Sequence, residues 1–194
     1  LSLSLRTSIV SVVSAPRNSA ANCRIPVRIS SKRKAGSGRL MFSHRRDCNN
    51  TVNTTIKNCN ISNFTTAVSF DGTNLSLITN ITASRVTRGV YWKNTLNSTI
   101  SASDMAIFNS SGAKTIILNY SSYNTVDGNN LTSGENSTNL QIDYSNGNTF
   151  SNNVILLGGL SLTYSPNCTI VNNNITTYLL SAVMLNSSSS RKTN

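Results

Sequence analysis

The feature that most constrains this chain is a short pattern that recurs six times between residues 55 and 175. Each copy centres on an apolar residue and carries a second one five positions later; the clearest copy runs from Asn148 to Ile155. The central residues are Ile56, Ile78, Ile100, Val126, Phe150 and Ile170, at steps of 22, 22, 26, 24 and 20 residues. Periods of this length are typical of stacked structural repeats and disfavour a single globular core.

Each copy also contains a pair of apolar residues spaced by two, which is the period that sends both side chains to one face of a β-strand. The pairs are Val68 and Phe70, Val90 and Trp92, Ile116 and Leu118, Leu140 and Ile142, Leu160 and Leu162, and Val183 and Leu185. Gly, Asn, Asp and Ser stand between the apolar segments, and these residues favour sharp corners. We therefore expect an all-β fold, a parallel β-helix of about six coils.

In such a solenoid, each residue lies about 4.8 Å from its equivalent in the next coil, so equivalent residues form columns. The central apolar residues predict a buried column, each side chain contributing about 1.5–3 kcal/mol. Trp92 is predicted to lie in the core beside Val90. An Asn at the following corner predicts an internal ladder of amide hydrogen bonds. These residues are Asn58, Asn80, Asn152 and Asn172.

The stretches 124–131, 148–155 and 169–175 resemble the N-T-I-x-x-N-x-I repeats of right-handed parallel β-helix proteins. That group includes NosD-like repeat proteins and a wider set of carbohydrate-binding proteins and sugar hydrolases, related in fold to pectate lyases. The resemblance covers about residues 48–186 and implies a right-handed solenoid. It implies a polysaccharide ligand only as an expectation, because one fold serves many functions.

The charge of the chain divides it into segments. The formal net charge is +11, but ten of the seventeen Lys and Arg precede residue 47 and all six acidic residues follow residue 46, which leaves +1 for residues 47–194. We expect a basic, poorly ordered arm at 1–46, β-helix repeats at 47–186 and a Ser-rich tail at 187–194. The basic run at 32–34 has no interleaved aromatic residues for base stacking, so no nucleic-acid partner is expected.

The metal-ligating residues are few. His44 is the only histidine, and the four cysteines form no C-x-x-C motif. We therefore expect no metal site and no cofactor, including the copper that the NosD resemblance raises. A disulfide is possible in an exported chain, for example between Cys48 and Cys59, but the sequence does not fix the pairing.

Three further expectations concern the setting of the chain. No apolar run reaches the roughly 18 residues of a membrane-spanning helix, so the chain is not expected to be transmembrane. The missing initiator Met suggests a fragment or a processed chain, and we expect a fragment of a longer repeat protein. Several Asn-x-Ser/Thr sequons fit a secreted or cell-surface glycoprotein, although a chain rich in Asn, Ser and Thr produces sequons by composition alone. Examples are Asn60, Asn63, Asn74, Asn130 and Asn186.

Polysaccharide-active members of the resembling group place charged residues on the outward face of one strand stack. The corresponding positions here are Ser69, Tyr91, Ile117, Gln141 and Ser161, followed at the strand ends by Asp71, Lys93, Asn119, Asp143 and Thr163. Tyr91, Asn119, Gln141 and Asp143 are the candidate glycan-binding residues.

Asp71, Tyr91 and Lys93 are the candidate catalytic residues. Lys93 would remove a proton beside a carboxylate, and the Tyr91 hydroxyl would return it; a surface ion pair with an ordinary exposed tyrosine is the alternative. Asp71 and Asp143 are three coils apart, about 14 Å, and do not form the carboxylate pair of a glycosidase.

Two functions follow from these expectations. The first is an exported, non-catalytic β-helix module that binds a polysaccharide or cell-surface glycan, or that forms part of a larger cell-surface protein. The alternative is a polysaccharide lyase, epimerase or hydrolase acting on acidic glycans.

Overall fold

The computed structural model describes residues 12–13, 47–107, 112–177, 182–188 and 191–193. The strands are β1 (Val12–Val13), β2 (Asp47–Asn49), β3 (Thr55–Ser62), β4 (Thr66–Asp71), β5 (Leu77–Ser84), β6 (Arg88–Lys93), β7 (Thr99–Ser101), β8 (Asp104–Ile107), β9 (Lys114–Asn119), β10 (Thr125–Asp127), β11 (Asn130–Asp143), β12 (Thr149–Ser151), β13 (Val154–Thr163), β14 (Thr169–Val171), β15 (Asn174–Thr176), β16 (Val183–Asn186) and β17 (Arg191–Thr193).

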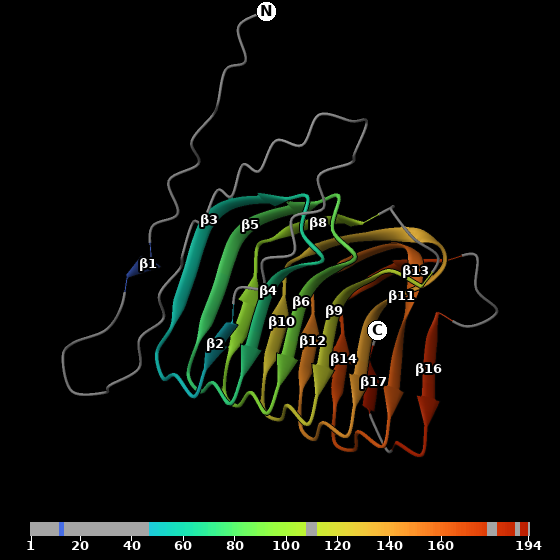
Figure 1. The fold of residues 1–194 in the computed structure, drawn as a ribbon. Coiled ribbons are helices and arrows are strands. Elements are labelled where there is room, and N and C mark those ends of the chain that lie inside the picture. Colours follow the sequence, from blue (N-terminus) through green and yellow to red (C-terminus); the bar gives the residue numbers. More distant parts are fainter. Residues whose placement is uncertain (1–11, 14–46, 108–111, 178–181, 189–190, 194) are drawn as a thin grey trace, which may run out of the picture.

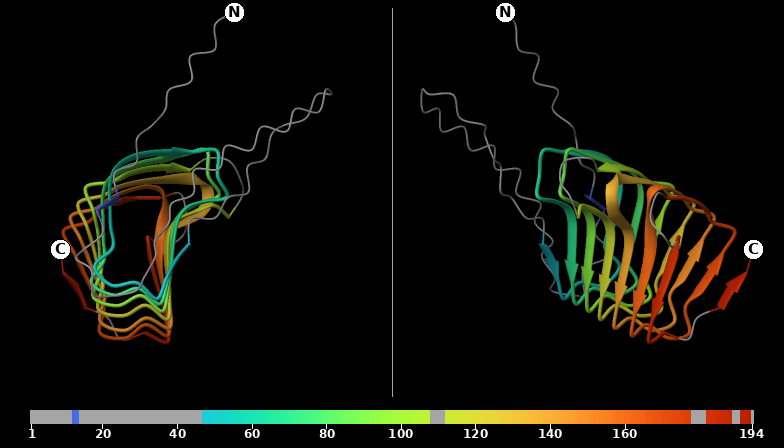
Figure 2. Two further views of the ribbon diagram at one scale, coloured as in Figure 1. Left: turned by 60° about the vertical axis from the view of Figure 1, so that its left-hand side comes forward. Right: turned by 90° about the vertical axis from the view of Figure 1, so that its right-hand side faces the viewer.

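These strands wind into a parallel β-helix of about six coils with three sheets (Figure 1). Sheet A contains the first parts of β3 and β5, followed by β7, β10, β12, β14 and β17. Sheet B contains the second parts of β3 and β5, then β8, the first parts of β11 and β13, and β15. Sheet C contains β2, β4, β6, β9, the last parts of β11 and β13, and β16. Seen from another side, the coils superpose almost one behind the other (Figure 2).

The core consists of the columns that the repeat predicts. The six central apolar residues pair in register through sheet A and are all buried. The paired apolar residues of sheet C are buried as well, except that Val183 is half-buried and Leu185 exposed in the last coil. Trp92 is fully buried and stacks on Phe70, with ring centroids 6.1 Å apart and an interplanar angle of 5°. The predicted fold, the central column and the core position of Trp92 are confirmed.

The corner between sheets A and B consists of one residue in the left-handed conformation, which favours Asn and Gly. Its occupants are Asn58, Asn80, Ala102, Gly128, Asn152 and Asn172, with φ between 47° and 63°. All six are exposed. The prediction that the Asn residues of this corner form an internal ladder is therefore wrong, because the side chain of an αL corner residue points out of the coil here. Asn80 and Asn58 do hydrogen-bond each other, but on the outer surface.

The internal ladder lies one residue later, at Asn129, Asn153 and Asn173. Asn153 accepts hydrogen bonds from the Asn129 backbone N–H and Nδ2, both at 3.0 Å. Its own Nδ2 donates to the Val126 carbonyl and to Asn173 Oδ1, both at 2.9 Å. Asn153 is buried, and these four bonds satisfy its amide and connect three coils.

The corner between sheets C and A has the same number of residues each time from its first occurrence, between Asn49 and Thr55, to the one between Thr163 and Thr169. The strand ends on both sides stay in register throughout. The corner between sheets B and C is different. Its length varies between coils, and β11 and β13 bridge it with register shifts between Thr132 and Leu140. The unequal repeat steps therefore arise at this one corner.

The ends of the array extend beyond the predicted repeat boundaries. From the predicted arm 1–46, the described residues are Val12 and Val13, which pair antiparallel with β3. The segment predicted as a Ser-rich tail from residue 187 contains β17, which pairs in parallel with β14 and continues sheet A. The strand array therefore continues past residue 186, through β17 to Thr193.

Candidate functional site

The outward face of sheet C presents its residues in the register that the sequence predicts. Tyr91 is aligned with Ser69 and Ile117, and Gln141 with Ile117 and Ser161. At the strand ends, Asp71, Lys93, Asn119, Asp143 and Thr163 form a second column. Side chains on this face therefore come from every coil and lie one strand spacing apart.

A cleft of about 320 Å³ lies on this face over β6, β9 and β11. Polar and charged side chains dominate its lining, which consists of Thr87, Arg88, Tyr91, Gly112, Lys114, Ile117, Asn119, Gln141 and Asp143. All four predicted glycan-binding residues are among them: Tyr91, Asn119, Gln141 and Asp143. We refer to this feature as the sheet C cleft.

The sheet C cleft carries two cationic residues that sequence reasoning did not select. Arg88 and Lys114 begin β6 and β9 and are paired in register, so their positive charges lie side by side at one end of the cleft. The Arg88 guanidinium carbon lies 5.8 Å from the centroid of the Tyr91 ring, within the range of a cation–π contact. At the other end, the Gln141 side-chain amide donates a hydrogen bond to the Asp143 carboxylate.

Gly89 lets β6 and β9, the strands that begin with Arg88 and Lys114, lie close together beneath the cleft. A Cβ at this position would collide with the Thr115 carbonyl oxygen of β9 and with the Met105 sulfur of β8. Any larger residue would therefore push β6 away from its neighbours and separate Arg88 from Lys114.

The three candidate catalytic residues occupy different environments. Tyr91 is half-buried in the cleft, whereas Asp71 and Lys93 are not among the lining residues. Lys93 Nζ lies 3.8 Å from Asp71 Oδ2, and both side chains are about 45% exposed. Asp71 Oδ1 also accepts a hydrogen bond of 3.0 Å from Asn94 Nδ2. An exposed pair of this kind contributes about 0–1 kcal/mol to stability.

The described residues contain neither a metal-binding cluster nor a membrane-spanning helix. No cluster of three or more His, Cys, Asp or Glu side chains with metal-binding geometry occurs among them. The described part of the chain also contains no helix of the length and hydropathy needed to span a bilayer.

The sequence profile of the right handed beta helix region matches residues 47–194, more than two thirds of the chain. The chain belongs to the right-handed β-helix family. Comparison with curated proteins and with solved structures gives no significant match. Membership of this family establishes the right-handed solenoid, while the narrower NosD-like and pectate-lyase-like resemblance stays a prediction.

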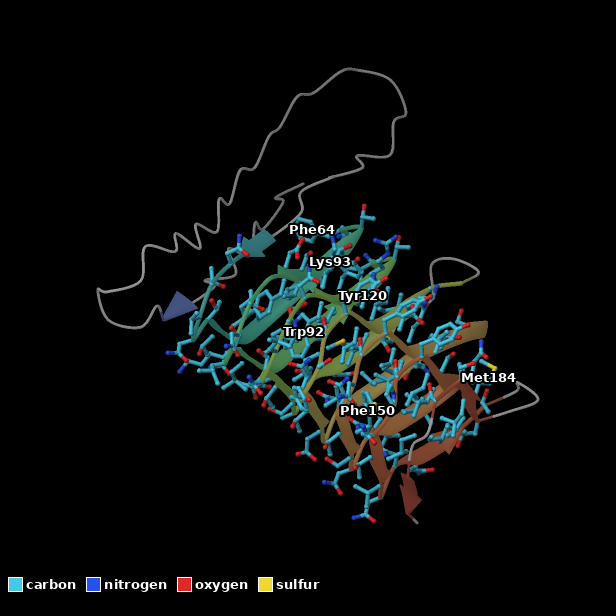
Figure 3. All side chains as sticks on the ribbon, turned by 90° about the horizontal axis from the view of Figure 1, so that it is seen from below. Phe64, Trp92, Lys93, Tyr120, Phe150 and Met184 are labelled. Atoms are coloured by element: carbon cyan, nitrogen blue, oxygen red, sulfur yellow. The ribbon has the colours of Figure 1, made fainter. Side chains whose placement is uncertain are left out.

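This β-helix protein carries a further surface feature beside the cleft, which we call the tyrosine ladder: Tyr120, Tyr144 and Tyr164. Each follows the last residue of a sheet C strand, and all three are about half exposed. Their rings stack, with centroids 5.1 Å and 5.2 Å apart and interplanar angles of 11° and 14°. Seen from below, Tyr120 lies close to Lys93 at one edge of the coils, whereas Trp92 and Phe150 lie nearer the middle (Figure 3).

The backbone of the tyrosine ladder is in an unfavourable conformation. All three residues have φ of 49° or 50°, in the left-handed region. The same corner position in the earlier coils is occupied by Asn50, Gly72 and Asn94, residue types suited to positive φ. A bulky residue there costs about 1–2 kcal/mol, whereas each aromatic stack contributes only about 0.5–1.5 kcal/mol. Three strained corners and two stacks do not favour tyrosine over asparagine for stability alone.

The sequence does contain a signal for the tyrosine ladder. The steps between its residues are 24 and 20, the same as the steps between the central apolar residues of those coils. An aromatic residue that repeats in phase with the coils, at a corner position that Asn and Gly hold in the earlier coils, indicates an exposed column.

Proposed function

We propose that this β-helix protein binds an acidic polysaccharide in the sheet C cleft without cleaving it. The observation that supports the proposal is the composition of the cleft, which contains the four predicted glycan-binding residues beside Arg88 and Lys114. Side-chain amides supply both donors and acceptors for sugar hydroxyls. The half-buried Tyr91 supplies an aromatic surface, and paired cations favour a carboxylate or sulfate group.

The positive end of the cleft provides the first test. Changing both Arg88 and Lys114 to Gln should weaken binding of an oligogalacturonate about tenfold, because each exposed charge contact contributes about 0.7 kcal/mol. The dependence of affinity on salt concentration should weaken at the same time. Isothermal titration calorimetry measures both quantities.

Lys57→Gln is the matched control for charge, because Lys57 belongs to the sheet A part of β3 and does not line the cleft. It removes a positive charge of the same kind and should leave the affinity unchanged. Equal losses in the control and the cleft variant would show only a general charge effect and would contradict the cleft as the binding site.

The mixtures of protein and oligogalacturonate used for calorimetry also distinguish binding from catalysis. Asp71 and Lys93 pair with each other outside the cleft lining, away from the ligand that the proposal places in the cleft. We therefore expect no unsaturated uronate product, as measured by ultraviolet absorbance. Product formation that Lys93→Gln or Asp71→Asn abolishes would replace the binding proposal with a lyase.

The proposal places this binding outside the cell, on a secreted or cell-surface chain. Its support is the exposure of several sequon asparagines, including Asn60, Asn63, Asn130 and Asn186. Mass spectrometry of the protein from its natural source should find a glycan on peptides that contain Asn60 or Asn130. Unmodified peptides throughout would remove this support for export.

A further inference from the structure

The tyrosine ladder begins at the rim of the sheet C cleft and continues beyond it. Tyr120 directly follows Asn119, and Tyr144 directly follows Asp143, both of which line the cleft. Tyr164 follows Thr163, one coil further along the solenoid. The backbone confirms the equivalence of these corners, because Tyr120 N donates to Asp143 O at 3.1 Å and Tyr144 N donates to Thr163 O at 2.9 Å. The cleft and the ladder therefore form one continuous surface parallel to the solenoid axis.

The stacking determines which part of each ring a ligand can reach. Tyr144 lies between Tyr120 and Tyr164, so its two faces contact its neighbours, yet 49% of the residue remains exposed. What the ladder presents to solvent is a row of ring edges and phenolic hydroxyls. Aromatic ring edges carry partial positive charge, and the hydroxyls donate hydrogen bonds. Such a row suits an anionic, hydroxyl-rich ligand better than an apolar one.

The spacing of the row suits a polymer. The rings repeat every 5.1–5.2 Å, close to the spacing of neighbouring strands. A pyranose unit in an extended polysaccharide advances by a similar distance. A linear chain laid parallel to the solenoid axis would therefore meet about one tyrosine per sugar unit.

We propose that the tyrosine ladder is an extended subsite for a linear acidic polysaccharide, which runs along the solenoid axis from the sheet C cleft across Tyr120, Tyr144 and Tyr164. The proposal rests on the proposed function of the cleft and adds two properties to it: the direction of the polysaccharide along the solenoid, and an affinity that depends on chain length. It also explains why tyrosines occupy three corners with positive φ, although stability alone does not favour tyrosine there.

The test compares oligogalacturonates of increasing length, from disaccharide to dodecasaccharide, by isothermal titration calorimetry. The variant changes Tyr120, Tyr144 and Tyr164 to Asn, the residue that occupies the same corner position at Asn50 and Asn94. For the wild type, affinity should rise with length until the chain spans both cleft and ladder. The triple variant should bind the shortest oligomers as well as the wild type does, but should bind the longest about tenfold more weakly.

Tyr123→Asn is the matched control. Tyr123 is also exposed and has φ of 58°, but it occupies the other left-handed position of the corner and its ring lies against Gly147 instead of in the ladder. This variant should keep the wild-type length dependence. Cello-oligosaccharides of the same lengths test the charge, and the ladder should add no affinity for these neutral chains.

The outcomes separate the ladder from the cleft. Equal length dependence in the wild type and the triple variant would overturn the ladder while leaving the cleft intact, and an equal gain with neutral chains would overturn the acidic ligand. No binding of any oligogalacturonate by the wild type would overturn both proposals. Circular dichroism should show that the triple variant folds. If it does not, Tyr164→Asn alone, beyond the cleft, should reduce affinity for the longest oligomers only, and an unchanged affinity would overturn the ladder.

Discussion

Replacing Asn153 with Leu should destabilise the fold by about 2–6 kcal/mol. The substitution leaves the buried Asn129 N–H without its acceptor and the Val126 carbonyl without the amide that donates to it. Each unsatisfied buried group costs about 1–3 kcal/mol, and the added methyl groups of Leu restore neither bond. A loss of this size is a large part of the total stability of a typical domain. Denaturant titration followed by circular dichroism gives the free energy of unfolding.

Asn152→Gly is the control from the adjacent position. Asn152 is exposed at a positive-φ corner, which Gly adopts readily, and its amide donates to the Asp127 carboxylate on the outer surface. The expected change is within about 0.5 kcal/mol. A larger loss for Asn152→Gly than for Asn153→Leu would show that the structural ladder is the outer row after all.

Replacing Trp92 with Ala should cost about 3–5 kcal/mol, because it removes the largest buried side chain of the core and leaves Phe70 without its stacking partner. Trp92→Phe should cost much less, since the remaining ring can still stack and the Trp92 indole N–H has no partner among the described residues. The same unfolding measurement distinguishes the two variants.

Tyr91→Ala, one residue earlier, should have the opposite consequence. Neighbouring residues of a strand face opposite sides, and Tyr91 lines the cleft while Trp92 fills the core. The Tyr91 variant should stay folded and lose glycan affinity. Unfolding of Tyr91→Ala together with a stable Trp92→Ala would mean that the two faces of sheet C are exchanged.

Sequence reasoning predicted the fold because each coil repeats the same requirement. A column such as Ile78, Ile100 and Val126 must stay apolar in every coil. The repeat period, the strands and the core residues are therefore visible in the sequence. The internal ladder was placed one residue too early. Positions 152 and 153 both carry asparagine, for different reasons: Asn152 adopts a positive φ, and Asn153 uses its amide for hydrogen bonds. The residue type alone does not distinguish these two roles.

The site was less predictable for a physical reason. Tyr91, Asn119, Gln141 and Asp143 occupy the regular part of sheet C, where strand alternation places them outward. Their convergence in the cleft could therefore be expected. Arg88 and Lys114 begin their strands just after the corner between sheets B and C, where coil length changes and the repeat gives no register. The tyrosine ladder was missed because corner residues were considered only for the turns they permit.

The confinement of length variation to a single corner has a consequence for how such a chain can change over generations. Up to Thr169, the corner between sheets A and B and the one between sheets C and A keep their lengths from coil to coil, so an insertion there would displace every column. The corner between sheets B and C tolerates added or lost residues without disturbing the coils on either side. Thr87 and Gly112, which line the sheet C cleft, come from this corner. A lineage can therefore remodel one wall of the cleft by insertion or deletion while the solenoid that supports it stays the same.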